Sequence, residues 1–101
     1  HCWVLDNWHK HTLIKAARLV SDKSGRVLEV LTTQPGAQVY TGNWLSGCPA
    51  GKNGHTYNDY DGVAIECQGF PDAPNHRNFP CQLLGPGEHY EQTIIYKFST
   101  K

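Results

Sequence analysis

Short apolar stretches, each with the alternation or the β-branched residues of a strand, recur along the whole chain between groups of Gly, Pro, Asn and Asp. Residues 27–33 give the clearest strand pattern, and residues 12–20 precede them across a short loop with a glycine, which predicts a β-hairpin. Further strands are expected over residues 1–10 (ending in a turn at Asp6-Asn7), 37–41, 63–65, 82–84 and 89–98. No segment has a secure helical pattern. The sequence therefore predicts an all-β fold of antiparallel sheets stacked as a sandwich.

The connections between these strands carry turn residues. Pro35-Gly36 is predicted to occupy the central positions of a type II turn. Residues 46–62 form a long loop that contains the strong turn signal Asn53-Gly54, and loops of this length in compact domains are usually functional or disordered. We expect this loop to border the functional cleft. One of three side chains would face a ligand: His55, Tyr57 or Tyr60.

Three prolines fix the path of a second loop, residues 69–81. Asp72 is expected to brace this loop by accepting hydrogen bonds from backbone N–H groups. Asn75 is expected to do the same or to reach the cleft. After this loop, residues 85–88 are predicted to turn the chain.

The composition limits the partners of the protein. Its 101 residues are enough for one domain or less. Nine basic and nine acidic residues leave no net charge and no basic stripe, which excludes nucleic acid as an expected partner. No stretch approaches the roughly 18–20 apolar residues of a membrane-spanning helix. The chain has no Met, so we expect that His1 is not a translation start and that the chain is part of a longer one.

Four cysteines are widely spaced, at positions 2, 48, 67 and 81. None has the C-x-x-C spacing typical of zinc sites, and two disulfides could pair in three ways. We expect free thiols, because Cys2 and Cys67 lie in apolar runs where Cys behaves as a small hydrophobe. There is no N-x-S/T glycosylation acceptor. Together these features favour a cytoplasmic location, with secretion as the alternative.

His9 and His11 are two residues apart, so on a strand they would share a face and could bind a metal. No third ligand is evident, and protein metal sites need more than two. A solvated pair of histidines is therefore the favoured interpretation, and no metal is expected.

Glu66 is the most informative position. It follows the apolar run 63–65 and precedes a loop rich in Gly and Pro. A carboxylate at the end of a buried strand is costly unless it is paired or hydrogen-bonded, and enzymes place general bases in such surroundings. The alternative, a structural carboxylate bonded by neighbouring backbone N–H groups, is the more common situation for a stretch of this kind taken alone.

Four separated motifs, in a consistent order, make the sequence resemble the aldose 1-epimerase family. Two of them are QPGAQVYTGN at residues 34–43 and IECQGFPDAPN at residues 65–75. The others are NFP at residues 78–80 and PGEHY at residues 86–90. The resemblance covers nearly the whole chain. It implies that residues 1–101 are the C-terminal portion of a single domain, a large antiparallel two-sheet β-sandwich of the galactose mutarotase-like type.

The resemblance also implies an activity. Members of this family interconvert the α and β anomers of hexoses such as galactose or glucose by acid/base ring opening, without a cofactor. Glu66 matches the position of the base, and Gln68 would orient the carboxylate or a sugar hydroxyl. Cys67 stands where Thr is common and would point to the opposite face of the strand. The other candidates for substrate binding are Asn43, Trp44 and Asn75.

The acid of this family is a His upstream of the matching segment, so the six His residues of this chain do not supply it. His1 resembles the His of an Asp-His pair whose Asp would lie one residue before the chain. We therefore expect activity only together with a second polypeptide or an upstream segment that completes the sandwich and covers its apolar faces and strand edges.

Two other interpretations stay open. A non-catalytic carbohydrate-binding module would use Trp44 and Phe70 to stack on a sugar, although a core Trp44 would have the same sequence signature. The second interpretation is a mutarotase-like protein with another substrate. A phosphosugar substrate would need a basic cluster, and the loops offer only Lys52 and Arg77. A carboxylate at Glu66 favours the enzyme, because a binding module does not need a base.

Overall fold

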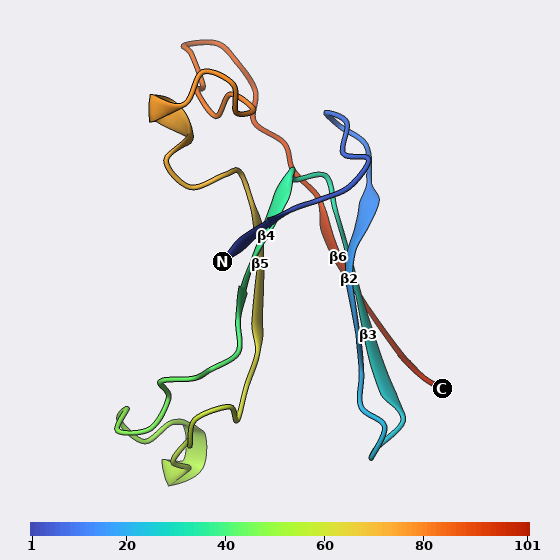
Figure 1. The fold of residues 1–101 in the computed structure, drawn as a ribbon, viewed down its shortest axis with the longest axis vertical. Coiled ribbons are helices and arrows are strands. Elements are labelled where there is room, and N and C mark those ends of the chain that lie inside the picture. The colour runs from blue at the N-terminus through green and yellow to red at the C-terminus, as the bar shows by residue number, and fades with distance from the viewer.

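The structure is a computed structural model that describes all residues, 1–101, and consists of six strands and two single turns of 3₁₀-helix (Figure 1). The strands are β1 (Cys2–Val4), β2 (Ile14–Val20), β3 (Arg26–Thr32), β4 (Gly36–Tyr40), β5 (Ala64–Gln68) and β6 (Ile94–Thr100). The 3₁₀ turns are η1 (Lys52–Gly54) and η2 (Ala73–Asn75). The strands form two antiparallel three-stranded sheets, so the predicted all-β class is confirmed. The chain contains no helix with the length and apolar character to cross a membrane.

The sheet β2-β3-β6 contains the predicted hairpin. β2 and β3 pair in register apart from one bulge between Lys15 and Ala17. Gly25 lies in their connection with a φ of +70°, a left-handed conformation that glycine adopts at little cost. β6 pairs with the other side of β3, from Arg26↔Thr100 onward, so β2 and β6 are the edges of this sheet.

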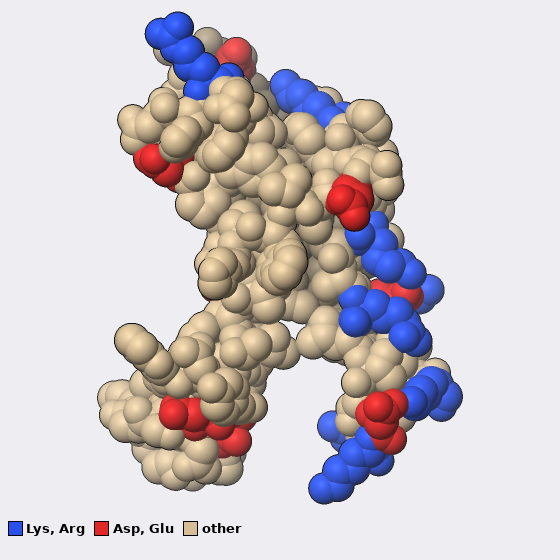
Figure 2. Space-filling model, viewed as in Figure 1, with Lys and Arg blue, Asp and Glu red and all other residues tan.

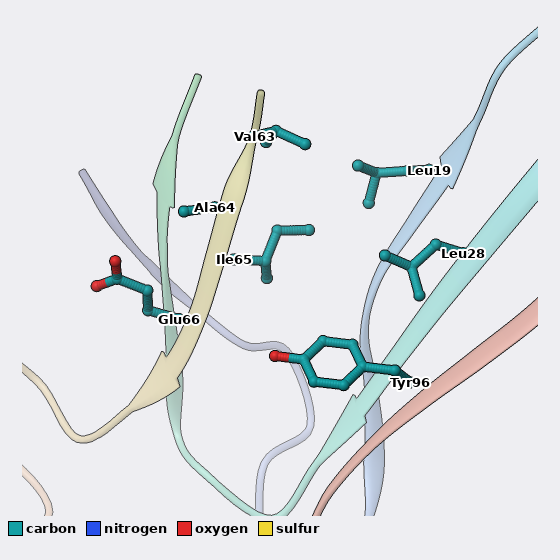
Figure 3. A pocket seen from close by; sticks show the side chains of 7 residues that line it. All are labelled: Leu19, Leu28, Val63, Ala64, Ile65, Glu66 and Tyr96. Carbon is teal, nitrogen blue, oxygen red and sulfur yellow. The ribbon is translucent and has the colours of Figure 1, made fainter. Parts of the chain in front are cut away.

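The two faces of the sheet β2-β3-β6 differ in polarity. Its outer face carries a row of charges in cross-strand register, Arg18↔Glu29↔Lys97. Figure 2 shows Lys and Arg side chains gathered along this side of the molecule. Its inner face is apolar where it looks toward the other sheet, as the side chains of Leu19, Leu28 and Tyr96 show (Figure 3). This sheet therefore has the hydrophobic-in, polar-out pattern of a sandwich sheet.

The sheet β1-β4-β5 has β4 in its centre. β4 pairs with β5 from Gly36↔Gln68 to Tyr40↔Ala64. The chain enters this sheet from β3 through residues 33–35. The indole Nε1 of Trp8 donates to the backbone oxygen of this connection at Thr33 (2.8 Å), which fixes the path between the two sheets.

The predicted type II turn at Pro35-Gly36 is wrong. Such a turn needs a positive φ at the residue after Pro, whereas Gly36 is not among the positive-φ glycines and is the first residue of β4. Glycine is needed there for space. A Cβ on Gly36 would stand 3.0 Å from the Sγ of Cys2 and 3.0 Å from the ring of Phe70.

The last quarter of the chain has fewer strand residues than the sequence predicts. Residues 82–84 form no strand, and β6 begins at Ile94 rather than at His89. The segment before β6 bonds the β3–β4 connection instead, where the Thr33 hydroxyl donates to Gln92 Oε1 at 2.6 Å. Apolar alternation was misleading here, because the segment crosses from one sheet to the other.

Several predicted turns are confirmed. Asn53 and Gly54 both have positive φ, of 57° and 72°, as an Asn-Gly turn requires. Asn7 has a φ of 57° in the turn that follows β1. The N–H of Glu88 donates to the oxygen of Gly85 at 3.1 Å and closes the turn there.

The space between the two sheets is poorly filled. Only 8 of the 101 residues are buried, and the radius of gyration is 16.6 Å, against about 13 Å for a compact domain of this length. An apolar hollow of about 300 Å³ lies between the sheets, against β2, β3, β5 and β6, and Figure 2 shows an open gap between the two halves of the molecule. Several large apolar side chains are exposed, among them Trp3, Leu83, Tyr96 and Phe98.

Candidate active site

Glu66 lies in the middle of β5 and is exposed, so the prediction of a buried carboxylate at a strand end is wrong. The strand continues through Cys67 and Gln68, and no element of the chain packs over Glu66. The carboxylate takes part in no ion pair and accepts no side-chain or backbone hydrogen bond. The alternative of a carboxylate satisfied by backbone N–H groups is therefore wrong as well.

Antiparallel register places amide side chains next to Glu66. Gln38 is its direct cross-strand partner, and such partners point to the same face with Cβ atoms about 4.5–5.5 Å apart. Gln68 lies two residues along β5 and points to that face too. Cys2 pairs with Gln38 from the other side. Cys2, Gln38 and Glu66 thus form one row across the three strands.

Gln38 is a candidate site residue that the sequence analysis missed. Alternation over residues 37–41 places it on one face of a strand, but only the register between β4 and β5 places it opposite Glu66. A polar side chain in the middle of an otherwise apolar strand was the one local signal available.

The neighbours of Glu66 on β5 point the other way, as strand alternation predicts. Figure 3 shows Ile65 directed into the gap between the sheets and Glu66 directed away from it. Burial raises the pKa of the Cys67 thiol, and the side chain of Thr32, on the other sheet, offsets part of this effect. One face of β5 therefore belongs to the core, and the other face carries the candidate site.

The hollow next to β5 is an unfilled core rather than a sugar site. Six of its seven lining residues are hydrophobic. The seventh, Glu66, directs its carboxylate away from the hollow (Figure 3). Ligand sites combine apolar walls with polar groups that converge on the ligand, and here the polar groups are on the outer face.

Asn43 and Trp44 follow β4, where it ends beside the start of β5. Asn43 lines a second hollow, of about 340 Å³, together with His1 and Trp3. Trp44 is 82% exposed, which excludes the core position considered for it. Its backbone N–H donates to the hydroxyl of Tyr40 at 3.2 Å.

Asn75 lies in η2, beyond the opposite end of β5 from Asn43 (Figure 1). Its side-chain amide donates to one carboxylate oxygen of Asp72, and His76 Nε2 lies 2.9 Å from the other. The hydrogen bond from Asn75, followed by that from His76, lowers the pKa of Asp72. Asp72 therefore braces its loop through side chains rather than through backbone N–H groups, which corrects the prediction.

The long loop after β4 borders the same end of β5 as Asn43. Its three candidate ligand-facing residues are exposed: His55, Tyr57 and Tyr60. The rings of His55 and Tyr57 pack edge to face with centroids 5.1 Å apart. The N–H of Tyr60 donates to the oxygen of Gly42 at 2.8 Å, which ties the loop to the residue before Asn43. Contact of these side chains with a ligand stays a prediction.

The histidines and cysteines give no further site. His9 and His11 lie outside the strands, and His11 is in a turn with a φ of 64°, so the strand that would have aligned them does not exist. No group of three or more His, Cys, Asp or Glu side chains is arranged to hold a metal ion. All four cysteines are unpaired, and two of them, Cys48 and Cys81, are exposed.

Known proteins resemble this chain over most of its length. A family model described as aldose 1-epimerase matches residues 1–97. The galactose mutarotase of Homo sapiens is 54% identical and that of Mus musculus 52% identical, each over 83 residues that cover 82% of this chain and 24% of the relative. The aldose 1-epimerase of Haemophilus influenzae is 37% identical over 97 residues, which cover 92% of this chain and 27% of the relative. The chain thus spans about a quarter of the length of the curated relatives it matches.

Proposed function

Because the chain belongs to the aldose 1-epimerase family, we propose that it carries the general base of a mutarotase, Glu66, and that the complete enzyme interconverts the α and β anomers of a hexose such as galactose or glucose. The strongest support is the exposed, unpaired carboxylate of Glu66, which lies in a cross-strand row with Gln38. A carboxylate that forms no hydrogen bond or ion pair within the chain is available to a ligand.

Mutarotation needs two proton-transfer groups on opposite sides of the sugar. A base removes the proton from the C1 hydroxyl while an acid protonates the ring oxygen, and the ring opens, rotates about C1–C2 and closes on the other face of the carbonyl. Each group typically contributes about 10²–10⁴ in rate. Glu66 would accept the proton of the C1 hydroxyl on one carboxylate oxygen. No electrons or groups leave the sugar, so the reaction requires no cofactor.

The amides beside Glu66 would orient the reactants. Each Gln offers an NH₂ donor and a carbonyl acceptor, so Gln38 and Gln68 would bond sugar hydroxyls or the carboxylate itself. Asn43 and Trp44 would close the cleft at one end of β5, and Asn75 would close it at the other.

The acid would come from a His outside residues 1–101, on an upstream segment or a second polypeptide that completes the sandwich. The support is the open apolar gap between the sheets and the exposure of Tyr96 and Phe98 on β6, because large exposed apolar patches mark surfaces that another segment covers. Residues 1–101 would then be the C-terminal portion of one β-sandwich domain. The unpaired thiols support a cytoplasmic location.

The test is a polarimetric assay of the complete enzyme on freshly dissolved α-galactose and α-glucose. Glu66→Gln keeps the size of the side chain and removes the base, so kcat should fall at least about 100-fold. Glu29→Gln is the matched control, since Glu29 is a mid-strand carboxylate on the other sheet, and its kcat should stay within about twofold of wild type.

Two outcomes would contradict the proposal. A Glu66→Gln enzyme with the wild-type kcat would show that Glu66 is not the base. A wild-type protein that binds either sugar in calorimetry, yet never equilibrates its anomers faster than buffer, would be a carbohydrate-binding module instead.

A further inference from the structure

Phe70 extends the side-chain face of Glu66 beyond the end of β5. The position that a Cβ would take on Gly36 is 3.0 Å from both Cδ1 and Cε1 of the Phe70 ring. Gly36 is the cross-strand partner of Gln68, so a Cβ there would point to the same face as Gln68. The ring therefore lies against the outer face of the sheet. Along the strands it is one pleat repeat, roughly 6–7 Å, from the row of Gln38 and Glu66.

Two side chains, Gln82 and Phe79, fix the position of Phe70. Gln82 donates from Nε2 to the backbone oxygen of Phe70 at 2.9 Å. The amide of Gln82 occupies the space beside Gly69 that any larger side chain would need. The ring of Phe79 packs edge to face on that of Phe70, with centroids 5.2 Å apart and an interplanar angle of 84°. Phe70 stays half-buried, so part of its ring is free to contact a ligand.

Phe79 is held in turn by an oriented histidine. The ring of His76 stacks on Phe79 with centroids 4.7 Å apart and an interplanar angle of 29°. His76 Nε2 lies 2.9 Å from Asp72 Oδ2, and Asn75 bonds the other oxygen of this carboxylate. A continuous chain of contacts thus runs from Asp72 through His76 and Phe79 to Phe70.

We propose that Phe70 is an aromatic wall of the sugar site and that His76 is the positioning residue that fixes this wall through Phe79. The inference rests on the proposed function and deepens it, since it names the part of the site that contacts the apolar C–H face of an aldose. Sugar rings present hydroxyls at their rim and C–H groups on their faces. The ring of Phe70 matches the C–H face of the sugar, and the polar row of Gln38 and Glu66 matches the hydroxyls at its rim. Ligand sites combine aromatic walls with a few polar groups in this way.

The experiment measures KM and kcat for three variants of the complete enzyme. Phe70→Ala should raise KM about tenfold and leave kcat within about threefold, because contact with the ring is equal in the ground state and the transition state. His76→Ala should raise KM about threefold. The double variant should have the KM of Phe70→Ala alone, because residues that act through one another are not additive. Independent, additive losses would overturn the positioning role of His76.

Gly36→Ala tests the position of the Phe70 ring by adding a methyl group next to it. Gly36 does not need a positive φ, so the only change is the new methyl group against the ring of Phe70 and the thiol of Cys2. KM should rise clearly more in the wild-type background than in the Phe70→Ala background, where the ring is gone and only the contact with Cys2 remains. An equal rise in both backgrounds would overturn the proposed wall.

His89→Ala is the matched control for His76. His89 is exposed and lies 3.6 Å from a carboxylate oxygen of Glu91, but it stacks on no aromatic ring, so its KM should equal that of wild type. Glu66→Gln, assayed alongside, separates this inference from the proposed function. If Glu66→Gln loses kcat but Phe70→Ala keeps the wild-type KM, only the proposed role of Phe70 is overturned. If Glu66→Gln is fully active, the proposal that Glu66 is the base is overturned.

Discussion

Glu29 and Glu66 hold similar places in the two sheets but have opposite surroundings. Both lie mid-strand, Glu29 on the central strand β3 and Glu66 on the edge strand β5. Glu29 bonds Lys15 and lies 4.0 Å from Arg18 and 3.9 Å from Lys97. The hydrogen bond from Lys15 is the largest cause of the lowered pKa of Glu29, and the three cations add to it. Glu66 has only an uncharged amide opposite it.

This difference distinguishes a carboxylate that stabilises a sheet from one that is available for chemistry. Lys15 bonds one oxygen of Glu29, and the two cations in cross-strand register, Arg18 and Lys97, lie close by, so its surroundings favour the ionised form of this carboxylate and engage it within the sheet. The amide opposite Glu66 can bond a ligand without neutralising the carboxylate. The cross-strand partners therefore favour a structural role for Glu29 and support the role as a base that we propose for Glu66.

Gln38→Lys should have the largest effect, because it gives Glu66 the kind of partner that Glu29 has. A cation about 4–6 Å away favours the ionised form of a carboxylate and makes it a weaker base, so kcat should fall about tenfold or more. Gln38→Met removes the amide without adding a charge and should mainly raise KM. If the Lys and Met variants have the same kcat in the polarimetric assay, charge opposite Glu66 is irrelevant to its function.

Glu29→Gln should have a smaller effect. It should lower the thermal stability of the protein without changing kcat, and only at pH values where Glu29 is ionised. The pKa of Glu29 is lowered from the ordinary 4.5, so the stabilisation is fully present above that value and is lost as pH falls through the lowered folded-state pKa. The Tm of the variant should be below that of wild type at neutral pH, and the two should converge in acid. The difference should also shrink in high salt. A Tm difference that persists unchanged at about pH 3 would contradict this account.

The smallest expected effect is a difference in thiol reactivity, which tests whether the face of β5 opposite Glu66 is buried. Burial raises the pKa of Cys67, whereas Cys48 and Cys81 are exposed. Because the thiolate is the reactive form, iodoacetamide at about pH 8 should alkylate Cys67 several-fold more slowly than either exposed thiol, as measured by peptide mass spectrometry. Equal rates would mean that the face opposite Glu66 is open to solvent.

The sequence predicts well those parts of the fold that depend on local contacts. The hairpin of residues 12–33 is such a part, since strand pattern and turn lie side by side in the chain. The segment before β6 was mispredicted because residues around Gln92 are held by Thr33, about sixty residues earlier. Local alternation contains no information on such a partner.

The same limit applies to the candidate site. The choice of Glu66 and Gln68 as candidates follows from the motif, and their common face follows from strand alternation. Gln38 becomes visible only through the register of β4 with β5. The exposure of Glu66 was mispredicted because an apolar run beside a carboxylate indicates a buried strand, whereas this face of the sheet is uncovered.

The pairing of β3 with β6 sets the order in which the chain can fold. Arg26 pairs with Thr100, so the hairpin leaves the ribosome long before its third strand has been synthesised. At roughly 5–20 residues per second, the wait is roughly 3–14 s. Throughout that interval β3 presents a free row of N–H and C=O groups that could pair with another nascent chain. Closing the sheet late is therefore a kinetic risk of this topology, and chaperone dependence during synthesis is the expected result.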